Sequence, residues 1–262
     1  MQTEKVVDYI VNWLKDYAIN AGVRGFVIGI SGGIDSAVTS TLCAKTGLEL
    51  LCIEMPIHQA ASHVSRAKEH INQLKQRFPN ARDTRVDLTP VFEEFKTEVI
   101  LEGKQATVDM ALANTRARLR MTTLYYHAGL LGLLVAGTGN KVEDFGVGFY
   151  TKYGDGGVDL SPIADLMKSE VYVIGKYLKV SESIMNAAPS DGLFGDARSD
   201  EDQIGASYPE LEWAMQMKDN DKTEHDFEGR QKQVFQIFMR YNRSNTHKMT
   251  PIPICEIPKE LK

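Results

Sequence analysis

The sequence predicts an α/β fold in which a doubly wound, mostly parallel sheet carries helices on both faces. Residues 24–30 (RGFVIGI) and 48–56 (LELLCIEMP) are continuous apolar runs, which are typical of strands buried on both faces. Segments of helix length follow such runs after short links, and this alternation is typical of parallel sheets. Because ligands of open parallel sheets bind at the carboxyl ends of the strands, we expect the functional site there.

The N-terminal half predicts three strands and the helices between them. Residues 1–17 have an amphipathic, helical pattern and include acidic side chains, so they predict a helix and not a signal peptide. Gly47 stops the helix that starts near Ile34, and Pro56 closes the second strand. In order, this half predicts a helix at 1–17, a strand at 24–30, a helix at 34–47, a strand at 48–56, a helix at 62–78 and a strand at 84–88.

The C-terminal half predicts one more strand and several helices. Its longest helix carries an apolar stripe at Ala113, Ala117, Met121, Leu124 and Ala128. No repeat, linker or low-complexity segment divides the chain, so we expect a single domain. In order, this half predicts a helix from Pro90, a helix at 111–132, a strand at 133–139, a mobile glycine-rich loop at 151–163, a helix at 168–178, an acidic loop at 186–210, two further helices and a proline-rich, non-helical tail at 247–262.

Composition and charge exclude several classes of function. The chain has 262 residues, of which 43% are hydrophobic, and this length is enough to bury a sizeable core. The net charge of −5 gives no general basic field for nucleic acid. No apolar run approaches the ~20 residues that a membrane span needs. Cys43, Cys52 and Cys255 are too few and too widely spaced for a disulfide framework or a zinc site, so we expect thiols in a reducing cytoplasm.

The segment GISGGIDSAV, residues 29–38, predicts a phosphate-binding loop between a strand and a helix. Its glycines let backbone amides approach an anion closely, and its serines add hydroxyl donors. The helix that follows directs free amides and the positive end of its dipole at the same point. An ordinary glycine turn entering a helix is the alternative, but six specified positions after a buried strand make it the weaker one.

The loop differs from the commonest phosphate loop because it has no lysine. A Walker A loop places a lysine where it reaches the β- and γ-phosphates. Here Asp35 stands in the loop and would repel phosphate unless it held Mg²⁺, which bridges carboxylates and phosphate oxygens. Such a loop suits an enzyme that binds the β,γ-pyrophosphate as a leaving group and exposes the α-phosphate to attack.

The segment SGGIDS resembles the signature of the N-type ATP pyrophosphatases, a superfamily that includes NAD synthetase, GMP synthetase, argininosuccinate synthetase and tRNA-modifying enzymes. Later segments are similar to NAD synthetases in order and spacing, so the similarity covers nearly the whole chain. TKYGDGG is the most specific of them. The segments are RARLRM (116–121), GTGNKVEDFGVGFYTKYGDGGVDLSPI (137–163), DLMKSEVY (165–172) and HKMTPIP (247–253).

This resemblance implies a Rossmann-like fold of the adenine nucleotide alpha hydrolase type and a ligase that forms a C–N bond. NAD synthetases convert deamido-NAD to NAD, using ATP and Mg²⁺, in the last step of NAD biosynthesis. The nicotinate carboxylate attacks the α-phosphate of ATP and gives an acyl-adenylate and pyrophosphate. Ammonia then attacks the activated carbonyl, and AMP leaves.

The resemblance also implies a set of site residues. Asp155, in the glycine-rich loop, is the candidate for handling ammonium, and Asp35 and Glu143 are the expected Mg²⁺ ligands, with Asp144 as the alternative to Glu143. Deamido-NAD would contact Arg118, Lys152, Asp159, His247 and Lys248. ATP would contact Gly29, Ile30, Ser31, Gly32, Gly33, Ile34, Asp35, Ser36, Thr138, Lys168 and Ser190.

Several polar residues have an alternative role or no role implied by the resemblance. Arg116 and Arg120 lie on the opposite edge of the predicted helix from Arg118, and solvated helix arginines are the alternative for both. Residues 55–66 (MPIHQAASHVSR) lack the acidic stretch that many family members have there, which weakens any transfer of adenosine contacts. His127 has no role implied by the resemblance. The histidines without ligand spacing, which we expect at the surface, are His58, His63, His70 and His225.

The nitrogen source and the assembly follow from the same resemblance. Some NAD synthetases carry an N-terminal glutamine-hydrolysing domain, but only 23 residues precede the first predicted strand. We therefore expect no glutaminase domain and the use of free ammonia, whether or not a separate amidotransferase supplies it. The family is homodimeric, with the dinucleotide substrate near the subunit interface, and the apolar helix at 111–131 is the candidate interface.

Two other functions compete with this prediction. Another N-type pyrophosphatase, such as a GMP synthetase or a tRNA thiolase, leaves TKYGDGG unexplained, and the paired cysteines typical of the thiolases are absent. A nucleotide-binding sensor without turnover would bind ATP and release no pyrophosphate. It would also leave the pair of carboxylates at Asp35 and Glu143 without a task.

Overall fold

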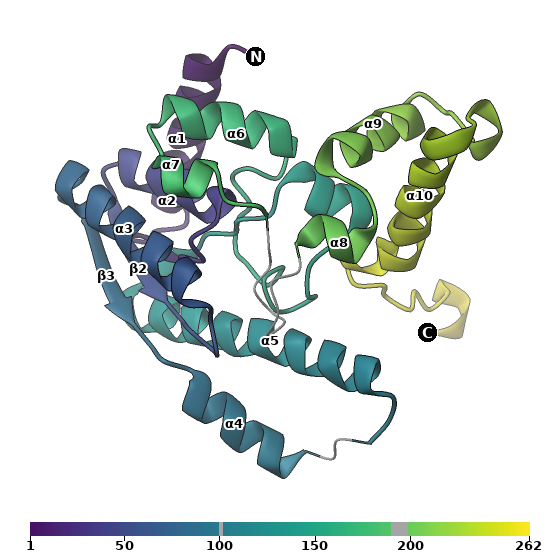
Figure 1. Cartoon of the computed structure of the whole chain (residues 1–262). Helices are drawn as coiled ribbons and strands as arrows, with labels where there is room; N and C mark the ends of the chain where they lie inside the picture. Colours follow the sequence, from purple (N-terminus) through teal and green to yellow (C-terminus); the bar gives the residue numbers. More distant parts are fainter. Residues whose placement is uncertain (100–101, 190–198) are drawn as a thin grey trace.

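The computed structural model describes residues 1–99, 102–189 and 199–262 (Figure 1). In these residues one sheet has four strands in the order β3-β2-β1-β4. All neighbouring strands are parallel, as predicted. The strands are β1 (Gly25–Gly29), β2 (Glu49–Glu54), β3 (Ala81–Arg85) and β4 (Leu133–Val135).

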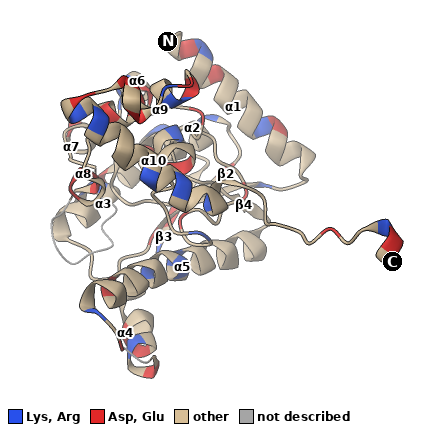
Figure 2. Ribbon diagram, turned by 90° about the vertical axis from the view of Figure 1, so that its right-hand side faces the viewer, with Lys and Arg blue, Asp and Glu red and all other residues tan. Residues whose placement is uncertain are grey.

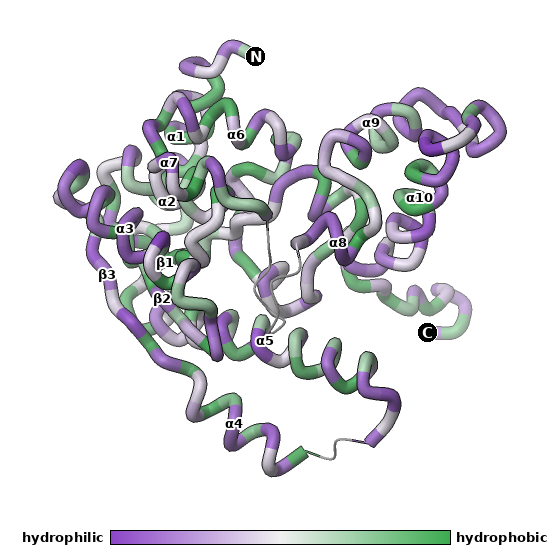
Figure 3. The backbone as a smooth tube through the Cα atoms, viewed as in Figure 1, coloured by the Kyte–Doolittle hydropathy of each residue, from purple (hydrophilic) through white to green (hydrophobic). Residues whose placement is uncertain are grey.

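Helices cover both faces of the sheet because successive strand residues point to opposite sides. Phe26 and Ile28 enter the core beneath the helices of one face, whereas Val27 enters the core on the other face. The central strands are the strongly apolar part of the tube in Figure 3. The first face carries α1 (Thr3–Asn20), α2 (Ile34–Lys45), α3 (Ala61–Arg77), α6 (Lys168–Tyr177) and α7 (Glu182–Met185), and the second carries α4 (Thr89–Glu98) and α5 (Gln105–Leu131).

The order of the strands places a crevice at the carboxyl ends of β1 and β4. From β1 the chain proceeds outward through β2 to β3, and then it crosses to the other side of β1 to form β4. The connections that leave β1 and β4 therefore separate at this point, which is where open α/β sheets bind ligands. Residues 30–36 and 136–140 meet there, as the sequence predicts.

A second group of helices lies beside this sheet (Figure 1). It consists of a π-helix (Val142–Val147), α8 (Asp200–Ile204), α9 (Tyr208–Asp219) and α10 (Gly229–Met249). Val142, Leu211 and Phe238 are fully buried in the core that these elements share. Since π-helical turns often occur at functional sites, the π-helix that carries Glu143 is a feature of the site as well as of the fold.

Two strands differ from their predicted bounds. β3 spans Ala81–Arg85 and not 84–88, because its residues ARDTR lie at the sheet edge, where backbone pairing with β2 and not an apolar run defines the strand. β4 is shorter than the predicted 133–139. After Val135 the chain keeps only an isolated bridge between Ala136 and Leu160 before it turns.

Three helical bounds also differ from the prediction. α5 starts at Gln105, before the predicted residue 111. The acidic segment 186–210 contains α8 and the start of α9, and its residues 190–198 lie outside the described part of the chain. α10 continues to Met249, so His247 and Lys248 lie in the last turn of a helix and not in the tail.

His70 is buried and not at the surface, so its predicted location is wrong. Its side chain is 2% exposed, and its Nε2 lies 2.8 Å from the Ser40 hydroxyl on α2. Burial, with a smaller contribution from Arg77, lowers the pKa of His70 to about 4.

Cys43 and Cys52 are buried thiols, and burial raises the pKa of Cys52 to about 12. No helix in the described ranges has the length and apolar character to span a membrane.

Replacing His70 by glutamine should flatten the acid dependence of stability. In the unfolded chain a histidine takes up a proton near pH 6.5, whereas folded His70 does so only near pH 4. The unfolded state therefore binds the proton first, and stability falls as the pH drops through this window, by about 3 kcal/mol at its lower end. Urea unfolding at several pH values measures this loss, which the variant should lack.

The exposed residue His225 provides the matched control. His225→Gln should keep the full acid dependence of the unmodified chain. An equal loss of stability in His70→Gln and in the unmodified chain over the same pH window would contradict the role of His70.

Candidate functional site

The loop after β1 forms the centre of the site. The hydroxyl oxygen of Ser31 lies 3.1 Å from that of Ser36 and accepts a hydrogen bond from the Gly33 amide at 3.2 Å. Ser36 Oγ donates to the Gly33 carbonyl at 3.0 Å. These bonds fold residues 31–36 into a compact turn in front of the first amides of α2, which is the geometry of an anion site.

Gly32 is the residue that this turn requires. Its φ of +82° lies in the left-handed region, and a Cβ built on it would lie 2.6 Å from the His63 carbonyl oxygen on α3. Arg66, also on α3, donates from Nε to the Gly32 carbonyl at 3.1 Å. α3 therefore holds the loop closely from one side and leaves no room for a side chain at position 32.

Lys168 joins the two carboxylates that the sequence predicts as metal ligands. Its Nζ donates to Asp35 Oδ2 at 2.6 Å and to Glu143 Oε1 at 3.0 Å. The lysine is 3% exposed, and the three residues come from the first turn of α2, the π-helix and the first turn of α6. Burial alone would lower the pKa of Lys168, but the two carboxylates outweigh burial and raise that pKa above its ordinary value.

Asn140 and Tyr208 form hydrogen bonds that hold Asp35 and Glu143 in place. The fully buried Asn140 donates from Nδ2 to Asp35 Oδ1 at 3.1 Å and accepts at Oδ1 from the Glu143 amide at 3.2 Å. The Tyr208 hydroxyl lies 2.5 Å from Glu143 Oε1 and 3.1 Å from Asp200 Oδ2. The Tyr208 ring also lies beneath the Lys168 ammonium, 4.6 Å from ring centroid to Nζ. The result is a single buried network that links the sheet to α8 and α9.

Glu143, and not its neighbour Asp144, lies in this network. Asp144 packs against the backbone of Gly139. Burial, followed by the nearby charge of Glu143, raises the pKa of Asp144 to about 8, so its carboxyl is mostly protonated at neutral pH. The choice of Glu143 over Asp144 as the metal ligand stays a prediction, and the contacts of Glu143 with Lys168 and Tyr208 favour it.

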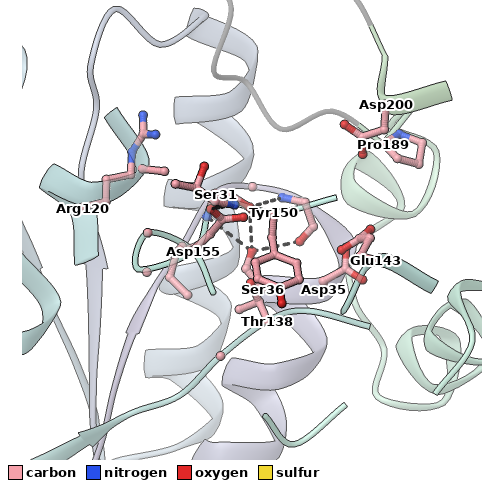
Figure 4. A pocket seen from close by; sticks show the side chains of 18 of the residues that line it. Ser31, Asp35, Ser36, Arg120, Thr138, Glu143, Tyr150, Asp155, Pro189 and Asp200 are labelled. Atoms are coloured by element: carbon pink, nitrogen blue, oxygen red, sulfur yellow. Dashed lines mark hydrogen bonds between the residues drawn. The ribbon is translucent and has the colours of Figure 1, made fainter. Parts of the chain in front are cut away.

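A cavity of about 600 Å³ adjoins the loop, and most of the predicted ATP contacts line it. Figure 4 shows Ser31, Asp35 and Ser36 in the pocket between Arg120 on one side and Glu143 on the other. Ser190 lies outside the described residues. The predicted residues that line the cavity are Gly29, Ile30, Ser31, Gly32, Gly33, Ile34, Asp35, Ser36, Thr138, Glu143, Asp155, Lys168 and Lys248.

The glycine-rich loop forms another wall of the cavity. Asp155 accepts from the Thr151 amide at 2.9 Å, and the Thr151 hydroxyl donates to Asn114 on α5 at 2.7 Å. Lys248 donates to the carbonyls of Gly148 and Tyr150 at 2.8 and 2.7 Å. α5 and α10 therefore hold the loop from two sides, and Asp155 lies at the cavity surface.

The other predicted deamido-NAD residues do not line the cavity. Arg118 donates to the Lys152 carbonyl at 3.3 Å, and Lys152 Nζ donates to the His247 carbonyl at 2.6 Å. We call Arg118, Lys152 and His247, which these two bonds connect, the outer patch. Asp159 instead accepts from the Val135 amide at 2.8 Å and from the Tyr125 hydroxyl at 2.9 Å. Arg118, Asp159 and His247 are exposed.

Arg120 is not a solvated helix arginine, so that alternative is wrong for this residue. Arg120 donates from Nε to the Met55 carbonyl at 3.0 Å and from Nη2 to Gln59 Oε1 at 2.9 Å. Arg120 and Gln59 line the cavity beside the loop. Arg116 is half-buried, and its guanidinium lies over the Phe92 ring, 4.3 Å from its centroid.

The carboxylate pair fits a hard cation. Asp35 and Glu143 converge on one positive group, the Lys168 ammonium, which acts as a stand-in for such a cation. Across the described ranges, no group of three or more His, Cys, Asp or Glu side chains has the geometry of a metal site. Mg²⁺ in proteins often takes one or two carboxylates together with substrate phosphates and water, and two carboxylates beside a phosphate loop match that pattern.

Sequence reasoning missed three residues of the site. Asn140 directly follows the predicted strand exit in GTGN, and a polar residue at that position was an available signal. Tyr208 lies 65 residues from Glu143 in the sequence, and Arg66 lies 34 residues from Gly32. Nothing local in the sequence links either residue to its partner.

Comparisons with known proteins show what the chain is similar to. The family described as NAD synthase matches residues 6–252. The chain is 39% identical to the NH(3)-dependent NAD(+) synthetase of Carboxydothermus hydrogenoformans over 80% of this chain and 84% of the relative. It is 37% identical to the enzyme of that name from Methanococcoides burtonii, over 93% and 91%. The solved structure of NMN synthetase from Francisella tularensis has a TM-score of 0.84 and 31% identity, and the match covers 99% of each chain.

Alanine at position 32 should weaken nucleotide binding strongly, because its Cβ has no room against α3. Gly47 is the matched control, since its φ of +75° is similarly left-handed but a Cβ there meets nothing within 4 Å. Gly47→Ala should cost about 1 kcal/mol of stability and leave ATP affinity unchanged. Gly32→Ala should weaken ATP binding about a hundredfold or more, measured by calorimetry. Equal ATP affinities in the two variants would contradict the steric argument.

Proposed function

The chain belongs to the NAD synthase family, and we propose that it carries out the ATP-dependent amidation of deamido-NAD by ammonia through one domain spanning residues 1–262. Members of this family are ligases that form a C–N bond, and the reaction yields NAD, AMP and pyrophosphate in the last step of NAD biosynthesis. The observation that carries the proposal is the lysine-free phosphate loop at the switch point of the sheet, with Asp35 and Glu143 converging beside it.

ATP binds along the loop in this proposal. The first amides of α2 and the hydroxyls of Ser31 and Ser36 hold the β- and γ-phosphates, and Lys168, Thr138 and Ser190 add contacts. Asp35 and Glu143 would hold Mg²⁺, whose charge offsets the charge that develops on the departing pyrophosphate. The α-phosphate then faces the open part of the cavity. The size and lining of that cavity support this placement.

Deamido-NAD approaches from the other side of the glycine-rich loop. The outer patch and Lys248 supply cationic and hydrogen-bonding groups for a dinucleotide, and Lys152 of the patch belongs to the loop at residues 148–158 that also lines the cavity. A carboxylate is a poor electrophile, so the nicotinate first attacks the α-phosphate and forms the acyl-adenylate. The protein contributes mainly by positioning the two substrates and by stabilising charge.

Asp155 handles the ammonium ion in this proposal. Ammonia is mostly protonated at neutral pH and must lose a proton before it attacks a carbonyl. Asp155 lies at the cavity surface, where its carboxylate attracts a cation and accepts the proton. The hydrogen bond from the Thr151 amide fixes one of its carboxylate oxygens at the cavity surface.

We propose a homodimer that forms through the outward face of α5. This helix carries few charges, as Figure 2 illustrates. Tyr126 and Leu130, one turn apart, are 65% and 63% exposed, and such apolar area favours an interface. A partner on α5 would lie beside Arg118 of the outer patch.

Buried free thiols at Cys43 and Cys52 support a reducing, cytoplasmic location.

A mononucleotide substrate is the second candidate, because the similarity to NMN synthetase from Francisella tularensis covers nearly the whole of both chains. The chemistry would be the same and the substrate would lack the second nucleotide. We favour the dinucleotide because the relatives from Carboxydothermus hydrogenoformans and Methanococcoides burtonii, at 39% and 37% identity, are both named NAD(+) synthetases.

One assay tests the reaction and its rivals together. The protein is incubated with ATP, Mg²⁺, ammonium and deamido-NAD, and NAD, AMP and pyrophosphate should form in equal amounts. Deamido-NMN should react with a kcat/KM at least about tenfold lower, because it lacks the binding energy of the second nucleotide. Xanthosine monophosphate or tRNA in place of deamido-NAD should give no product. Failure to form NAD at saturating substrates would overturn the proposal.

Asp155→Asn should slow the second half-reaction only. The amide keeps the hydrogen bond from Thr151 but accepts no proton, so the ammonia-dependent kcat should fall about a hundredfold. A single-turnover burst of pyrophosphate should remain, because adenylation precedes the attack of ammonia. The exposed Asp165→Asn is the control and should react normally. A full ammonia-dependent rate in Asp155→Asn would remove this residue from the mechanism.

A further inference from the structure

The Lys168 ammonium occupies the position where the proposed function needs a divalent cation. It lies 2.6 Å from Asp35 Oδ2 and 3.0 Å from Glu143 Oε1, the two carboxylates that would hold Mg²⁺. The same lysine is also a predicted contact of the ATP phosphates. In this arrangement both carboxylates engage its Nζ within the buried network.

The other hydrogen bonds of the carboxylates leave little freedom around this position. Asp35 Oδ1 accepts from Asn140, and Glu143 Oε1 also lies within hydrogen-bond distance of the Tyr208 hydroxyl. A divalent ion would need the oxygens that the ammonium now contacts, and the two cations would repel each other at this distance. Lysine and metal therefore compete for one place.

Lys168 has a route away from the carboxylates. It is the first residue of α6, it lines the cavity that contains the phosphate loop, and its side chain has four flexible methylenes. Triphosphate on the loop would present several negative oxygens on the cavity side of the ammonium. These oxygens offer the charge compensation that the lysine loses when it leaves Asp35 and Glu143.

We propose that Lys168 is a built-in counter-ion that holds the Asp35–Glu143 pair until the nucleotide arrives, and then moves to the phosphates as it yields the carboxylates to the metal. This proposal rests on the proposed function, since it takes that pair as the metal position. It makes metal binding depend on nucleotide. Without nucleotide the lysine blocks the pair and keeps two buried negative charges compensated.

Binding of Mn²⁺ to the full chain tests the exchange. The electron paramagnetic resonance signal of free Mn²⁺ reports the unbound fraction, and α,β-methylene-ATP serves as an uncleavable nucleotide. The unmodified chain should bind Mn²⁺ weakly alone and at least about tenfold more tightly with the analogue. Lys168→Met should bind Mn²⁺ without nucleotide at least about tenfold more tightly than the unmodified chain does.

Three variants test whether the change in Mn²⁺ affinity arises at the Asp35–Glu143 pair. Lys168→Arg keeps a cation at the pair, so its nucleotide-free affinity should stay weak. Adding Glu143→Gln to Lys168→Met should remove the affinity gained, because it removes one of the two carboxylates. Lys141→Met, which removes a half-buried lysine paired with Asp165 on the protein surface, should bind Mn²⁺ as the unmodified chain does.

Two results would overturn the exchange: equal Mn²⁺ affinities of Lys168→Met and the unmodified chain, or tight nucleotide-free binding by the unmodified chain, which needs no variant to fold. Loss of the folded state in Lys168→Met that added Mn²⁺ restores, seen by circular dichroism, would support it. The proposed function fails separately. If the chain makes NAD but Lys168→Met and the nucleotide analogue leave the Mn²⁺ affinity unchanged, only the exchange is refuted. If the Mn²⁺ affinity changes as expected but the chain makes no NAD, only the proposed function is refuted.

Discussion

Two carboxylates beside a phosphate loop create an electrostatic conflict, because both the ligand and the residues that receive it are negative. In this structure the buried ammonium of Lys168 resolves the conflict, since it contacts both Asp35 and Glu143. The three residues come from α2, α6 and the π-helix. Their ion pairs therefore connect segments that are far apart in the chain. Tyr208 extends the network to α9. The sheet and the C-terminal helices therefore have separate apolar cores but share one polar junction.

The fold supplies this junction through the order of its strands. β4 lies on the opposite side of β1 from β2 and β3, so the connections after β1 and β4 separate and leave space at the carboxyl edge of the sheet. α3 holds the loop through Arg66 and leaves no room for a side chain at Gly32. α5 and α10 hold the glycine-rich loop, which lines the cavity and carries Lys152 of the outer patch. In the proposed function the cavity and the patch receive the two substrates, and Asp155 lies at the cavity surface.

The sequence predicts those features whose physical cause is local. β1 and β2 are buried on both faces, so apolar runs reveal them, and the phosphate loop keeps its glycines and hydroxyls within a few residues. β3 gives no such signal, because an edge strand with polar side chains is defined by backbone pairing. His70 resembles a surface residue in a charged helix and is buried by contact with α2. The resemblance to NAD synthetases named Lys168 and Asp35, which lie 133 residues apart, but not the contact between them. Such a contact exists only after folding.

The central claim is that the loop presents the α-phosphate of ATP to a carboxylate, and the fate of a single oxygen atom tests it most directly. Deamido-NAD labelled with ¹⁸O in its carboxylate is converted with unlabelled ATP and ammonium, and the products are analysed by mass spectrometry. Attack on the α-phosphate predicts that AMP carries one ¹⁸O atom and that pyrophosphate carries none. Unlabelled AMP, or label in phosphate or pyrophosphate, would contradict the account.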